Sequence, residues 1–69
     1  MMTTDETAIT ANLKSLAEIL GDVATRAAEA AEAMKAGERN QAIGTAIGID
    51  EDLRTALALH GAAIALHRR

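Results

Sequence analysis

Hydrophobic side chains recur along the first half of the chain with a seven-residue period. The steps between them alternate between four and three residues, so on a helix they form one lengthwise stripe. Such a stripe is typical of a helix that packs along its length against another helix. The residues of this stripe are Ile9, Leu13, Leu16, Leu20, Val23, Ala27, Ala30 and Met34.

The ends of this first helix also carry signals. Thr3, followed three residues later by Glu6, forms a capping-box pattern. Lys35 and Gly37 supply the basic last turn and the left-handed glycine that commonly end a helix. We therefore predict a helix over about residues 4–36. Its opposite side is polar and is predicted to face solvent: Lys14, Glu18, Asp22, Thr25, Glu29 and Glu32.

The second half repeats the same spacing. After a turn, Asn40 is the expected N-cap of a second helix over about residues 40–67. Beyond Leu53 the apolar arc covers about half of the circumference, which is more than one neighbouring helix can cover. The stripe consists of Ala42, Ala46, Ile49, Leu53, Ala56, His60, Ala63 and His67.

Residues 44–50 leave two interpretations open. Gly44 and Gly48 each destabilise a helix interior by about 1 kcal/mol. The acidic run Asp50-Glu51-Asp52 also has the character of a new first turn. The second helix is therefore either continuous with a kink or divided here into two helices.

The size of the chain predicts self-association. Its 69 residues form one domain, 1–69, and contain no Phe, Tyr or Trp to enlarge the core. A single helical hairpin buries only one side of each helix. We therefore expect an all-α hairpin that pairs with a second copy as a homodimeric four-helix bundle. The side chains predicted to carry this association are Leu13, Leu16, Leu20, Val23, Leu53, Leu57 and Ile64.

Composition narrows the possible functions. The absence of cysteine excludes disulfides and thiolate chemistry, and a single serine leaves no nucleophile triad to assemble, so no enzyme is expected. The acidic N-terminus differs from a signal peptide, and no apolar run is long enough to span a membrane, so we expect a cytoplasmic protein. A net charge of −3 without aromatic residues makes nucleic acid a poor partner.

His60 and His67 are the weak candidates for a metal or haem site. Seven residues place them about 10.5 Å apart along a helix, so they cannot chelate one ion from the same helix. Two copies could bring them together, but the more favoured interpretation is that His60 packs by its ring and His67 interacts with the helix C-terminus. No catalytic residue and no cofactor is therefore expected.

These patterns predict a small non-enzymatic helical interaction protein of adaptor type that acts as a homo-oligomer and could also offer a groove to a partner protein helix. In size and helix count, such a dimer resembles the Rop-type four-helix bundle, a resemblance that implies RNA binding. A nucleic-acid-binding regulatory dimer that uses Arg54, Arg68 and Arg69 is therefore one alternative. A bundle that binds a metal or haem through His60 and His67 is the other.

Overall fold

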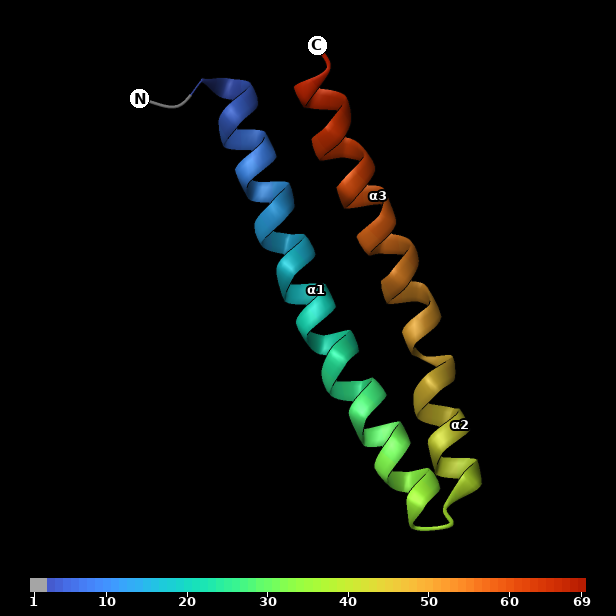
Figure 1. Ribbon diagram of the computed structural model, residues 1–69. Coiled ribbons are helices and arrows are strands. Elements are labelled where there is room, and N and C mark those ends of the chain that lie inside the picture. The colour runs from blue at the N-terminus through green and yellow to red at the C-terminus, as the bar shows by residue number, and fades with distance from the viewer. Residues whose placement is uncertain (1–2) are drawn as a thin grey trace.

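The chain folds into one long helical hairpin. The computed structural model describes residues 3–69, which form three helices and no strand. The first arm is α1 (Thr4–Lys35), and the second arm consists of α2 (Arg39–Ile47) and α3 (Ile49–His67). The second arm returns along the first, so that the end of α3 lies beside the start of α1 (Figure 1). The Cα extents of 52 × 19 × 11 Å describe a layer that is one helix thick.

The predicted bounds of the first helix are confirmed. The Thr3 hydroxyl accepts a hydrogen bond from the Glu6 backbone N–H at 3.1 Å, as the capping box requires. At the other end Gly37 takes φ +80°, and the N–H of Glu38 donates to the carbonyl of Ala33 at 2.8 Å. This left-handed glycine reverses the chain into the second arm.

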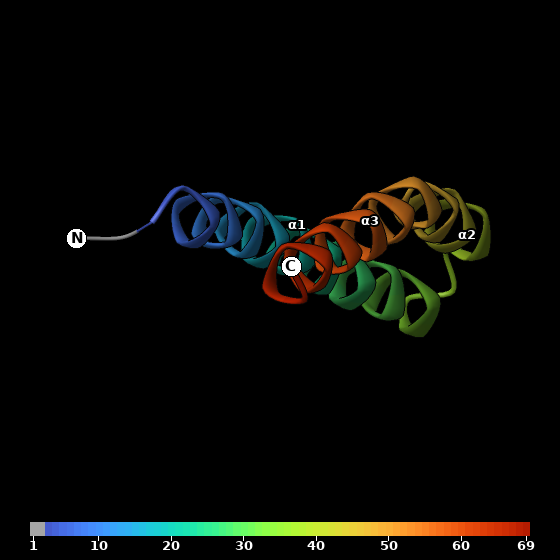
Figure 2. The same cartoon turned by 90° about the horizontal axis from the view of Figure 1, so that it is seen from above.

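The second arm is bent at Gly48 and divided there into α2 and α3. The bend lies within residues 44–50, where the sequence predicted a kink or a break, and the acidic run Asp50-Glu51-Asp52 lies in the first turn of α3. The two pieces stay nearly in line (Figure 1), and the arms are inclined to one another when seen from above (Figure 2). The prediction of Asn40 as N-cap is wrong, because α2 begins at Arg39 and Glu38 takes the cap position.

Two glycines give opposite expectations for substitution by alanine. Gly48 has ordinary helical angles, and an added Cβ would only touch the Thr45 carbonyl at 3.6 Å. We expect Gly48→Ala to raise the free energy of unfolding by about 0.5–1 kcal/mol. Gly37→Ala should lower it by about 1–2 kcal/mol, because φ +80° is strained for any residue with a Cβ. Urea unfolding of both variants measures the difference, and equal effects would contradict it.

The arms meet along one row of side chains on each, which we call the hairpin seam. Every member is buried or half-buried, whereas nearly all other described residues are exposed. On α1 the seam comprises Ile9, Asn12, Leu16, Ile19, Val23, Arg26, Ala30 and Ala33. On the second arm it comprises Ala42, Thr45, Ile49, Asp52, Ala56, Leu59, Ala63 and Leu66.

The seam differs from the predicted stripes at every second position. Half of the predicted α1 stripe lies in the seam, but Leu13, Leu20, Ala27 and Met34 are exposed outside it. Their seam places are taken by Asn12, Ile19, Arg26 and Ala33, each one residue earlier. The second arm shifts in the same way, with Asp52, Leu59 and Leu66 replacing the predicted Leu53, His60 and His67.

Close packing in the seam depends on alanine. The buried hydrophobic side chains among the described residues are Ala33, Ala42, Ala56 and Ala63. Because an alanine adds little bulk, the two arms can approach closely at these positions. The same residues bury little surface, so the larger hydrophobic side chains stay half-buried or exposed. The hairpin by itself therefore has a very thin core.

Candidate interaction surface

The residues that directly follow the seam residues form a second, largely apolar row on each arm. We call the two rows together the apolar face. On α1 the row is Thr10, Leu13, Ala17, Leu20, Ala24, Ala27, Ala31 and Met34. On the second arm it is Ile43, Ala46, Asp50, Leu53, Leu57, His60, Ile64 and His67.

Both rows lie on the same side of the hairpin. A step of one residue rotates a side chain by about 100° around the helix axis. Since the two arms run in opposite directions, this rotation carries both rows toward the same flank. The rows also keep the alternating three- and four-residue spacing of a packing stripe. Each helix thus has two packing stripes about 100° apart, one facing its mate and one facing outward.

The outward stripe exposes large hydrophobic side chains. Leu57 is 71% exposed, Met34 50% and Leu20 44%. The other large members of the face are Leu13, Ile43, Leu53 and Ile64, and all are at least one-third exposed. Ile47, which lies beside the face on α2, is 70% exposed. Burying one such side chain from water stabilises a protein by roughly 1.5–3 kcal/mol. Within residues 3–69, these side chains remain between 37% and 71% exposed.

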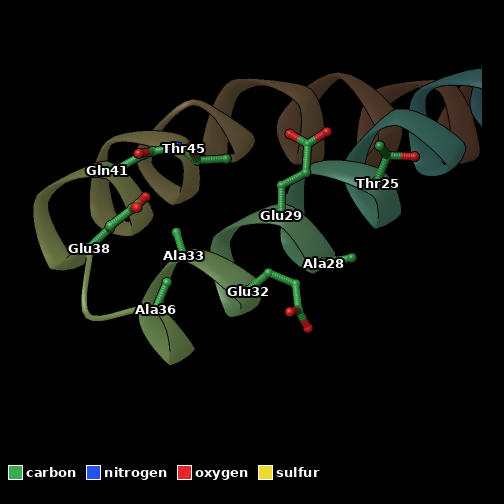
Figure 3. Close-up of a pocket in the computed structure, with 9 residues that line it drawn as sticks. All are labelled: Thr25, Ala28, Glu29, Glu32, Ala33, Ala36, Glu38, Gln41 and Thr45. Carbon is green, nitrogen blue, oxygen red and sulfur yellow. The ribbon is translucent and has the colours of Figure 1, made fainter.

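The opposite flank is polar, as the sequence predicted. Residues that directly precede seam residues include Asp22, Glu29 and Glu32, and all three are exposed. Near the turn this flank is hollowed into an open groove of about 670 Å³ (Figure 3). Alanines and polar or acidic side chains line it together. The lining residues are Thr25, Ala28, Glu29, Glu32, Ala33, Ala36, Glu38, Gln41 and Thr45.

An ion pair inside the seam joins the two arms. The Arg26 guanidinium donates to the Asp52 carboxylate at 2.7 Å, and both side chains are partly shielded from water, with 43% and 31% exposed. A second pair, Arg69 with Asp5 at 2.9 Å, joins the open end of the hairpin. These pairs link residues far apart in sequence, and the helical pattern alone gave no sign of them.

We expect the Arg26–Asp52 pair to contribute measurably to stability. Because both groups are partly shielded, a double-mutant cycle of Arg26→Ala and Asp52→Ala should give a coupling energy of about 0.5–1 kcal/mol. The Arg54–Asp50 pair, at 3.1 Å but 79% and 68% exposed, is the control and should give less than about 0.5 kcal/mol. Denaturant unfolding of both cycles provides the measurement, and a larger coupling for the exposed pair would contradict it.

The residues predicted to carry association fall into two groups. Leu13, Leu20, Leu53, Leu57 and Ile64 lie on the apolar face and are exposed. Leu16 and Val23 lie in the hairpin seam and are half-buried between the arms. The face also contains members that the prediction left out, namely Met34 and Ile43 together with the alanine rows.

The two histidines belong to the apolar face on α3, and both are exposed. Within residues 3–69, no group of three or more His, Cys, Asp or Glu side chains is arranged to hold a metal ion. Of the arginines considered for nucleic-acid contact, Arg54 and Arg69 are paired with carboxylates.

Two further findings complete the description. Over residues 3–69, the helices lack the combination of length and apolar character needed to cross a membrane. Comparison with known proteins finds no matching protein family and no significantly similar curated protein or solved structure.

Proposed function

We propose that this protein is a non-enzymatic helical interaction protein that works as a homodimer, in which the apolar faces of two hairpins pack against each other as a four-helix bundle. The observation that carries this proposal is the second packing stripe on each helix. A hairpin that works alone needs one stripe per helix, whereas a helix in a square four-helix bundle contacts two neighbours about 90° apart. Both arms carry two stripes about 100° apart.

The distribution of charge supports the same function. Along residues 10–67, the apolar face contains one charged side chain, that of Asp50. The opposite flank carries acidic side chains on both arms, with Glu18, Asp22, Glu29 and Glu32 on α1 and Glu51 on α3. A depletion of charge on a surface that is otherwise rich in charge is characteristic of a protein–protein interface.

The mass of the native chain in solution tests this proposal. We expect sedimentation equilibrium to give twice the 7.2 kDa chain mass at micromolar concentration, with dissociation on dilution accompanied by loss of helical circular dichroism. The two changes should coincide, because the thin seam leaves each hairpin dependent on its partner. A monomer that stays helical and unfolds cooperatively at all concentrations would overturn the proposal.

A further inference from the structure

The apolar face carries information about how the second copy is oriented. Two identical faces can pack around a two-fold axis in only two simple ways. If the axis runs along the hairpin, both turns lie at the same end of the bundle, and α1 of one copy packs on α3 of the other. If the axis runs across the hairpin, the turns lie at opposite ends. Then α1 packs on α1, and the second arm packs on the second arm.

The ion pairs between the arms show which residues of the two arms lie at the same height along the hairpin. We call each such height a level. Arg26 lies opposite Asp52, and Asp5 lies opposite Arg69. To within about one helical turn, every other level follows from these two anchors. From the open end to the turn, the level pairs across the apolar face are Thr10 with His67, Leu13 with Ile64, Ala17 with His60, Leu20 with Leu57, Ala24 with Leu53, Ala27 with Asp50, Ala31 with Ala46 and Met34 with Ile43.

The same-end arrangement would bring Asp50 and His60 no polar partner from the second copy. In it, each level meets the same level of the other copy, so Asp50 would lie on Ala27 and His60 on Ala17. Asp50 would keep its exposed contact with Arg54, but shielding the carboxylate with alanine would remove water without adding a hydrogen bond, which is unfavourable. Three levels would also place large side chains on large ones, at Leu13 with Ile64, Leu20 with Leu57 and Met34 with Ile43.

The opposed arrangement gives Asp50 and His60 a polar partner and places several large side chains opposite small ones. With the faces fully overlapped, the axis passes between Leu53 and Leu57 on α3. Asp50 of one copy then comes level with His60 of the other, to within about 3 Å along the bundle axis. On either side, Ile64 meets Ala46, Leu13 meets Ala31 and Leu20 meets Ala24, so that large side chains face small ones at these levels. Beside the axis, Leu53 meets Leu57.

From this we infer, building on the homodimer proposed above, that the second copy covers the apolar face in the opposed orientation, with Asp50 of each copy bound to His60 of the other. The pair occurs twice, once on each side of the axis, and it is the polar contact that selects this orientation over the alternative. The Asp50 carboxylate can keep its surface contact with Arg54, because one carboxylate accepts several hydrogen bonds. Polar groups inside a helical interface are known to select register in this way.

Disulfide crosslinking separates the two orientations, because the chain has no cysteine of its own. We expect Ala46→Cys protein mixed with Ile64→Cys protein to form a crosslinked heterodimer on oxidation. In the opposed arrangement these positions face each other, whereas in the same-end arrangement they lie about 27 Å apart along the axis. The matched control is Ala31→Cys protein mixed with Ala46→Cys protein, for which the two distances are reversed. We expect the first mixture to crosslink at least about tenfold faster, since a disulfide needs Cα atoms within about 7 Å.

A charge exchange tests the pair itself. His60→Glu places two carboxylates together and should raise the dimer dissociation constant at least about tenfold. Adding Asp50→Lys to the same chain restores opposite charges and should recover most of the lost affinity. The same pair of changes would have no mutual effect in the same-end arrangement, because there the two side chains lie about 15 Å apart along the axis.

The outcomes distinguish this inference from the proposed function. A dimer that crosslinks equally in both mixtures, or faster in the control, overturns the opposed orientation but leaves the homodimer intact. The opposed orientation is also overturned, with the homodimer intact, if adding Asp50→Lys to His60→Glu does not lower the dissociation constant. A chain that stays monomeric at all concentrations overturns both.

Discussion

Ala56→Asp should unfold the hairpin. Ala56 is 5% exposed and lies in the middle of the hairpin seam, where α3 approaches α1. A carboxylate at this position loses its hydration, and the half-buried neighbours opposite it include no cation for residue 56 beyond Arg26, which is already bound to Asp52. An uncompensated buried charge destabilises a protein by about 3–5 kcal/mol. For a chain of this size, that loss lowers the unfolding midpoint by at least about 12 °C.

The control for this prediction lies two residues further along the same helix. Ala58 is exposed on the flank away from the apolar face, so Ala58→Asp makes the same chemical change and the same change in helix propensity without burial. We expect its free energy of unfolding to stay within about 0.5 kcal/mol of that of the native chain. Thermal unfolding followed by circular dichroism measures this difference. Equal losses in the two variants would show that helix propensity rather than the seam determines stability.

Sequence patterning predicted the helical hairpin, since capping signals and periodicity depend on local chemistry. Thr3 and Glu6 cap α1 as predicted, and Gly37 reverses the chain. The bend was bracketed by Gly44 and Asp50, although the pattern alone did not decide between a kink and a break. Local signals could not decide it because Gly48 has ordinary helical angles, so the interruption comes from weak helix propensity and not from a required left-handed residue.

The hairpin seam was harder to predict because α1 is apolar over more than one stripe. A single heptad stripe through Ile9, Leu13, Leu16 and Leu20 combines positions from two adjacent surfaces. The predicted stripe combined large side chains with alanines, but alanine allows the closest approach of the two arms, and Arg26 is held in the seam by a carboxylate from the other arm. Periodicity does not show which residue of the other arm pairs with this half-buried arginine.

The apolar face was predicted only in part for the same reason. Leu13, Leu20, Leu53, Leu57 and Ile64 were identified as association residues, but Leu16 and Val23 were grouped with them although they lie in the seam. One signal in the sequence could have separated the two sets. The residues after each seam position are nearly free of charge, whereas those before it on α1 include Glu18, Asp22, Glu29 and Glu32. The difference in charge becomes clear when the residues before and after each seam position are compared.

Leu57→Asp should separate the two copies while leaving the seam residues unchanged. Leu57 is 71% exposed in the hairpin, directly follows the buried Ala56, and occupies the centre of the apolar face. A homodimer loses the side chain twice, so about 3–6 kcal/mol of hydrophobic burial disappears, before any repulsion between the new carboxylates. We expect the dissociation constant to rise by at least about a hundredfold, measured by sedimentation.

Three consecutive residues thus distinguish the hairpin seam, the apolar face and the opposite flank. Ala56→Asp should remove helicity at every concentration, because it disrupts the contact between the arms of one chain. Leu57→Asp should shift the gain of helicity to concentrations at least about a hundredfold higher, because it weakens the contact between the two copies on which each hairpin depends. Ala58→Asp should retain both the helicity and the concentration dependence of the native chain. If Leu57→Asp instead kept the native sedimentation profile, the apolar face would have no part in holding two copies together, and the exposed leucines and isoleucines of this hairpin would need another occupant.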